Sequence, residues 1–282
     1  MKALFTFFAL IVLAPAFLFS QQSDKLAVPE GRLLFAPLIA HHIEPRVGLS
    51  RLVDVERLRL DIGNSIDLLR WHDLSGGAQV AVGADFFTWT SLRQERDFHF
   101  PVDAVDYLFG VNASYLRPLS IDWVGSLRFR LSHISAHLAD GSYDKQQAQW
   151  RDNRLPIVYS REFLDLIAAF EWRGMLRFYG GAAWIYHIDP VWLGQWAMQG
   201  GAEAVWRSAG LAWLHAYAAV DMRLVDISGW HTAVNAQLGV KAGRWRGTGV
   251  QLFVAWFHGK SQHGEYFDQT WSYWGPGFNI DF

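Results

Sequence analysis

The chain has 282 residues, of which 51% are hydrophobic and 18% charged, and its formal net charge is -2. Only its first segment approaches the roughly 20 apolar residues of a membrane-spanning helix, which argues against a helical membrane protein. The absence of a Lys/Arg block argues against nucleic acid as a partner. The chain has no cysteine, which excludes disulfides, a cysteine lipid anchor and Cys-ligated metals.

Residues 1–20 are predicted to be a secretory signal peptide. Lys2 supplies a positive charge, residues 3–19 are apolar, and small residues precede the polar stretch that follows. This is the layout of a segment removed on export, and a single N-terminal membrane anchor is the alternative. We expect residues 21–45 to be a periplasmic lead-in and residues 46–282 to form one domain.

Apolar and polar residues alternate along most of that domain. In "VDYLFGVNASY", Val105, Tyr107 and Phe109 share one face, whereas Asp106 and Asn112 share the other. Such alternation predicts strands with one apolar and one polar face. The alternating segments run for about ten residues, the length that crosses a bilayer at a tilt, and Trp and Tyr gather near their ends. A sheet in lipid must close on itself, so we predict an all-β, antiparallel transmembrane β-barrel.

Twelve strands are predicted, and ten is the alternative because the first two segments alternate least clearly. The last strand ends in Phe282, which resembles the C-terminal assembly signal of bacterial outer-membrane barrels. This resemblance implies recognition by the barrel-assembly machinery and a location in the outer membrane. The predicted strands are residues 46–52, 56–71, 77–91, 103–117, 121–137, 157–171, 175–187, 196–207, 212–225, 229–243, 247–258 and 270–282.

The inward-facing positions of the predicted strands carry charges of both signs. Among them are Arg128, Arg130, Asp165 and Glu203. A barrel of this size has a narrow interior. We therefore expect a lumen filled by paired charges rather than an open pore of one sign.

A candidate catalytic site lies where strand 121–137 reaches its external end. Its lipid-facing positions change there to His133, Ser135 and His137. If the next hairpin pairs symmetrically about residue 148, Glu162 lies diagonally within about 5–8 Å of both His133 and Ser135. A histidine can take the proton of a serine hydroxyl, and a carboxylate can orient the imidazole.

The His-x-Ser spacing resembles the H-x-S-N motif of outer-membrane phospholipase A and of the lipid A deacylase. The resemblance implies serine hydrolase chemistry on esters of outer-membrane lipid, either phospholipid or lipopolysaccharide. Ala136 stands where the motif has asparagine, so Glu162 would have to serve as the third member.

A wider resemblance covers most of the chain. The segments that carry it include "LLFAPLIAHHIEPR", "LSHISAHLAD", "YSREFLDLIAAF" and "FYGGAAWIYHIDP". In these segments the chain is similar to an exported bacterial family known as domain of unknown function 1207, which implies an outer-membrane barrel and no established activity.

A second group of polar residues is expected near the external loops. His187, Asp189, His258 and His263 could line a rim pocket or bind a divalent metal, and ordinary loop polarity is the alternative. Calcium that bridges lipid headgroups is considered because residues 140–144 offer carboxylates, although they lack the pattern of an EF-hand. The metal therefore stays unassigned.

Two classes of function follow from the sequence. One is a lipid esterase with Ser135 as nucleophile, His133 as base and Glu162 as orienting acid. The other is a non-enzymatic barrel, namely a narrow channel, an adhesin or an envelope scaffold. Hydrogen bonding between these three side chains on the outer surface would favour the esterase.

Overall fold

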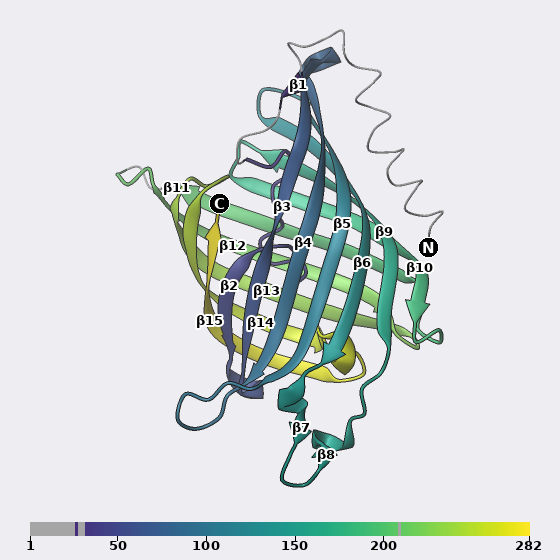
Figure 1. Ribbon diagram of the computed structural model, residues 1–282. Helices are drawn as coiled ribbons and strands as arrows, with labels where there is room; N and C mark the ends of the chain where they lie inside the picture. Colours follow the sequence, from purple (N-terminus) through teal and green to yellow (C-terminus); the bar gives the residue numbers. More distant parts are fainter. Residues whose placement is uncertain (1–25, 28–31, 208–209) are drawn as a thin grey trace.

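The computed structural model describes residues 26–27, 32–207 and 210–282 (Figure 1). It confirms the prediction of a closed antiparallel barrel of 12 strands. Residues 1–20, predicted to be a signal peptide, lie outside the described residues. The barrel strands are β2 (Val47–Leu52), β3 (Arg57–Leu74), β4 (Ala78–Arg93), β5 (Val102–Pro118), β6 (Trp123–Leu138), β9 (Tyr159–Trp172), β10 (Leu176–Asp189), β11 (Trp196–Arg207), β12 (Leu214–Asp226), β13 (Trp230–Gly243), β14 (Gly249–Lys260) and β15 (Thr270–Asp281).

The barrel closes between its first and last strands. β2 pairs with β15 on one side and with β3 on the other, and β6 pairs with β9. The remaining elements are short: β1 (Leu26–Ala27) adds to β3, and β7 (Tyr143–Asp144) pairs with β8 (Gln149–Trp150) in a loop. Single turns of 3-10 helix complete the set, namely η1 (Val53–Val55), η2 (Ser75–Gly77), η3 (Asp140–Ser142), η4 (Arg151–Asn153) and η5 (Gly264–Tyr266).

The two ends of the barrel differ in their connections. The end that carries the C-terminus, at the top of Figure 1, has short turns such as residues 119–122 and 173–175. The opposite end has longer loops, including residues 139–158 with β7 and β8. Outer-membrane barrels place short turns in the periplasm and long loops outside, so the C-terminus is periplasmic. Within the described residues, no helix is long and apolar enough to span a membrane.

Alternation along the strands sorts the side chains as predicted. The outward Phe109 and Phe129 are 49% and 42% exposed, as befits residues that contact lipid acyl chains. The inward Asp106, Arg128 and Arg130 are buried in the lumen. The protein is therefore an outer-membrane barrel with an apolar belt and a polar interior.

The lumen contains a plug formed by residues 33–46, the segment that precedes β2. Phe35 and Leu38 pack against the inward-facing Ile167, Ala169 and Tyr179. The sequence predicts that residues 21–45 form a periplasmic lead-in, whereas the structure places residues 33–46 inside the barrel. The reason is that inward strand positions offer both an apolar patch and unmatched charges to the segment.

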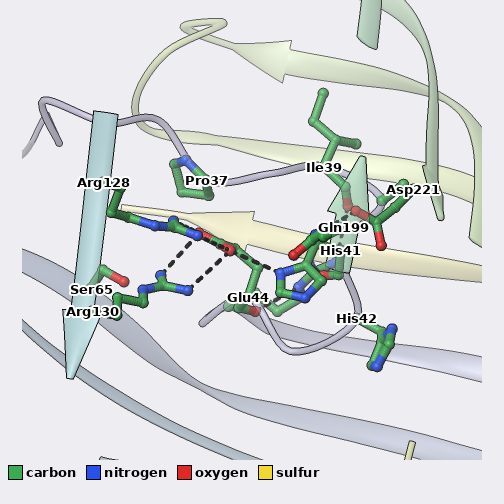
Figure 2. Close-up of polar contacts among 12 residues, drawn as sticks. Pro37, Ile39, His41, His42, Glu44, Ser65, Arg128, Arg130, Gln199 and Asp221 are labelled. Atoms are coloured by element: carbon green, nitrogen blue, oxygen red, sulfur yellow. Dashed lines mark hydrogen bonds and ion pairs between the residues drawn. The ribbon is translucent and has the colours of Figure 1, made fainter. Parts of the chain in front are cut away.

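Ion pairs anchor the plug to the barrel wall. Figure 2 shows Arg128 and Arg130 of β6 reaching the same carboxylate, that of Glu44. Arg130 Nη2 lies 3.1 Å from Glu44 Oε1, and Glu44 Oε2 lies 3.2 Å from His41 Nδ1. The plug backbone is also held, because Ile39 N donates to Glu203 Oε1 at 2.9 Å. The predicted pairing of lumen charges is therefore completed by the plug.

Candidate active site

The candidate site lies on the outer face of β6, β9 and β10, near their extracellular ends. Pairing of β6 with β9 places His133 directly opposite Glu162 and Ser135 directly opposite Ser160. This register differs by one residue from the symmetric hairpin expected about residue 148. The shift brings Glu162 closer than expected, because directly opposed residues share one face of an antiparallel pair.

Glu162 and His133 form a carboxylate–imidazole pair. His133 Nδ1 lies 2.7 Å from Glu162 Oε1, and the two side chains are 39% and 26% exposed. A carboxylate accepts the Nδ1 proton, so this contact favours the tautomer whose Nε2 carries a lone pair. The Nε2 atom of His133 is then free to accept a hydrogen bond.

A second histidine contacts the same carboxylate from β10. A bulge between Ile185 and His187 brings His187 opposite Glu162, and His187 Nδ1 lies 2.5 Å from Glu162 Oε2. The bulge turns both Tyr186 and His187 outward, whereas strict alternation would have turned His187 into the lumen. Glu162 therefore joins two imidazoles across three neighbouring strands.

Ser135 completes the cluster by position rather than by a hydrogen bond. It lies two residues from His133 on β6 and therefore on the same outer face. Among the described residues, no hydrogen bond joins Ser135 to His133.

The neighbours of Ser135 supply further polar groups. Tyr107 of β5 lies directly opposite Ser135, and its ring centre is 6.0 Å from that of His137. On the other side, Ser160 Oγ donates to Glu162 Oε1 at 3.5 Å. The cluster thus combines two serines, two histidines, one carboxylate and a phenol on a surface that faces lipid.

The structure does not assemble the predicted rim pocket. His187 joins Glu162, and Asp189 lies opposite Ser160 at the end of β10. His258 lies on the outer face of β14, stacked on Trp256. His263 instead turns into the barrel, where its Nδ1 lies 2.7 Å from Asp106 Oδ2. These residues are separated because strand parity and the inward fold of the η5 loop direct them to different faces.

Metal ligation was tested against the same residues. Within the described residues, no group of three or more His, Asp or Glu side chains is arranged to hold a metal ion. Calcium needs six to eight oxygen ligands, whereas the site offers one carboxylate whose two oxygens already contact histidines. The site residues of this chain therefore do not fit a bound calcium ion.

Two members of the cluster, Tyr107 and Ser160, are not among the site residues predicted from the sequence, and His187 is predicted only as a residue of the rim pocket. The bulge at His187 has no signal in the local sequence. Tyr107 and Ser160 could have been found from the alternation, because it places both on the outer face of the strands that flank Ser135.

Comparison with known proteins agrees with the architecture. The family described as Protein of unknown function (DUF1207) matches residues 103–282. No curated protein matches the chain significantly by sequence.

Among solved structures, outer membrane phospholipase A from Escherichia coli, an active-site variant, superposes with a TM-score of 0.55 at 11% identity, covering 90% of this chain and 95% of that chain. The calcium-bound dimer of outer membrane phospholipase from Salmonella typhi gives 0.54 at 10% identity, with 90% and 95% covered. LpxR from Salmonella typhimurium gives 0.35 at 13% identity, with 80% and 88% covered, a score too low to support an inference. At these identities, the two phospholipase structures show a shared fold.

Proposed function

We propose that this chain, which belongs to the family described as Protein of unknown function (DUF1207), hydrolyses ester bonds of outer-leaflet lipids. The observation that carries the proposal is the 2.7 Å contact between His133 Nδ1 and Glu162 Oε1 on the lipid-facing surface, two residues from Ser135. A soluble substrate would have little reason to meet a site on this face. A lipid ester lies beside it at all times.

The proposed reaction is a two-step acyl transfer. His133 Nε2 takes the proton of Ser135 as its Oγ attacks the ester carbonyl carbon. The tetrahedral intermediate then expels the alcohol part of the lipid, which receives that proton from the imidazole, and an acyl-serine remains. A water molecule, deprotonated by His133, attacks the acyl-serine and releases a fatty acid and free Ser135.

Glu162 orients His133 and stabilises the imidazolium that forms in each step. The negative charge that develops on the carbonyl oxygen needs hydrogen-bond donors. The hydroxyl of Tyr107 is the proposed donor, because Tyr107 lies directly opposite Ser135 on the same face. Backbone amides are less suited to this task because the strand ladder already uses them.

The similar fold of the two phospholipase structures supports a lipid ester as the substrate class, by analogy rather than by residue correspondence. Phospholipid and lipopolysaccharide both present acyl esters to the outer leaflet. Calcium is not assigned a role in any step, because the site residues do not fit it. Assays with and without calcium test that point directly.

The test is fatty-acid release from mixed micelles of phospholipid or lipopolysaccharide by the purified protein. We expect release by the unchanged protein and complete loss in Ser135→Ala. Ser132→Ala is the matched control, because Ser132 lies on the same strand but is buried in the lumen. If release survives in Ser135→Ala but is lost in Ser160→Ala, the nucleophile is Ser160 and the assignment of Ser135 is wrong. The absence of release from both lipids would overturn the esterase.

A further inference from the structure

A cluster of arginines surrounds the periplasmic mouth of the barrel, at the opposite end from the candidate active site. Two adjoining cavities of about 440 and 260 Å³ lie there, and both are lined by Arg32 and Arg246. We call this region the basic vestibule. It is defined by Arg32, Arg70, Arg177, Arg207, Arg244, Arg246 and Trp245.

Half of the vestibule arginines pair with carboxylates, namely Arg70 with Asp67, Arg177 with Glu203 and Arg246 with Glu171. Among the described residues, Arg32, Arg207 and Arg244 have no ion pair. Among the described residues, the Arg207 guanidinium donates only to the backbone oxygen of Gly174, at 3.1 Å. Arg244 is exposed, and within the same residues its backbone N–H donates to Thr248 O at 2.9 Å while its guanidinium has no hydrogen bond or ion pair. Three guanidinium groups, those of Arg32, Arg207 and Arg244, therefore face the larger cavity without an ion pair among the described residues, and Phe282 lines the same cavity.

Burial adds to the electrostatic potential of the vestibule. Burial and the nearby guanidinium of Arg177 lower the pKa of Arg246 to about 10, despite the opposing carboxylate of Glu171. Because burial and Arg177 make the charged form of Arg246 less favourable, an anion that enters the cavity would interact strongly with this guanidinium. Trp245 and Leu33 add apolar surface beside the charges.

The chemistry of the lining selects phosphate among common anions. The planar fork of a guanidinium donates two parallel hydrogen bonds to phosphate oxygens, and several such groups match a phosphate from different sides. We propose that the basic vestibule binds the phosphate group of a periplasmic ligand, either an inner-leaflet phospholipid or a free phosphorylated solute.

A gap in strand pairing in the barrel wall beside the vestibule would let a phospholipid reach it from the inner leaflet. β2 pairs with β3 only over Arg57–Asp61, and β1 pairs with it only at residues 70–71. Among the described residues, β3 therefore has no strand on that side over residues 62–69. A further cavity of about 110 Å³ runs along this seam and is also lined by Arg32 and Arg246. The vestibule thus continues to the seam of the barrel, next to the inner leaflet.

Binding is tested by titration calorimetry on the full chain in neutral detergent, in a Ser135→Ala background that prevents turnover. The probes are phosphatidylglycerol in mixed micelles, inorganic pyrophosphate and uncharged diacylglycerol. We expect a phosphate-bearing probe to bind and the affinity to fall roughly tenfold or more when Arg207 and Arg244 are both replaced by alanine, since hydrogen bonds to charged groups contribute about 1.5–3 kcal/mol. Added salt should also weaken binding.

Arg173→Ala is the matched control, because Arg173 lies in a turn at the same end but pairs with Asp122. Binding of phosphatidylglycerol alone would support a lipid ligand, and binding of pyrophosphate as well would support a soluble one. Three outcomes would overturn the proposal: no binding of either phosphate-bearing probe, equally strong binding of diacylglycerol, or an unchanged affinity in the double variant. Because these residues are remote from Ser135, the result is independent of the esterase test.

Discussion

The two faces of β6 place polar residues in opposite environments. On the inner face, Arg128 and Arg130 are buried and share the carboxylate of Glu44. On the outer face, His133 and Ser135 are partly exposed, and the serine hydroxyl has no partner among the described residues. The same strand therefore carries a closed ion network on one side and an open cluster on the other.

This difference distinguishes charged residues that stabilise the fold from polar residues that are free to react. A buried charge must be paired, so the inner network is explained by the folding of the plug alone. The outer cluster has no such requirement at a headgroup interface, and its carboxylate–imidazole geometry adds a base beside a free hydroxyl. The comparison predicts that inner substitutions lower stability, whereas outer substitutions lower activity.

A large effect on activity is expected on the outer face, in Glu162→Gln. Loss of the carboxylate charge removes both the orientation of His133 and the stabilisation of its imidazolium, so fatty-acid release should fall by about 10²- to 10⁴-fold. The midpoint of urea unfolding should stay unchanged. Asp189→Asn, at the same end of the neighbouring strand, is the control. Full activity in Glu162→Gln would remove Glu162 from the mechanism.

On the inner face, Glu44→Ala should cost stability. Removal of Glu44 leaves Arg128 as an unpaired buried charge, while Arg130 keeps its 3.1 Å contact with Asp85, and the loss should cost about 3–5 kcal/mol in the free energy of unfolding. Urea unfolding in detergent measures this loss, with Glu95→Ala at an exposed loop as the control. The released plug should also give ion conductance in planar bilayers, where the unchanged barrel is closed. A silent, fully stable variant would contradict the anchoring role of Glu44.

A smaller loss is expected from the apolar part of the plug. Leu38 is fully buried against the inner wall, so Leu38→Ala leaves a cavity that should cost about 2–3 kcal/mol. Thermal unfolding in detergent provides the measurement, and Val191→Ala in an exposed loop should change nothing. If the melting temperature is the same in both variants, the plug does not contribute to the folded core.

The smallest expected loss of activity distinguishes the roles of the two histidines that contact Glu162. His187→Gln removes one of two imidazoles from Glu162 but leaves the His133 contact intact. Activity should therefore fall by less than about tenfold, the equivalent of one hydrogen bond. The matched measurement is His133→Gln, which should abolish fatty-acid release. Equal losses in the two variants would mean that either histidine can serve as the base.

Strand periodicity made the barrel predictable from the sequence. Each predicted strand corresponds to one barrel strand, because alternation such as that around Phe129 and Arg130 reports directly on the two faces of the wall. Register was less accessible, since the shift that brings Glu162 opposite His133 depends on how the loop over residues 139–158 folds. The recognition of Phe282 by the barrel-assembly machinery stays a prediction.

The plug was missed because residues 33–46 show neither strand nor helix periodicity. One signal was present, however. Arg128 and Arg130 share the inner face of one strand, and the wall carboxylate of Asp85 pairs with Arg130 alone, so Arg128 needs a further carboxylate. Glu44, in the unassigned segment, was available to supply it. A search for inward-facing charges without a partner on the wall can therefore indicate a plug segment, which strand periodicity does not reveal.

The position of the plug in the chain also sets an order of events. Residues 33–46 precede β2, and the ring closes where β2 meets β15, the strand that is made last. A segment already seated against Arg128 and Arg130 would be enclosed as the ring shuts, whereas a late arrival would have to thread a narrow opening. On this topology, the ion pairs of Glu44 with Arg128 and Arg130 would form before β2 and β15 join.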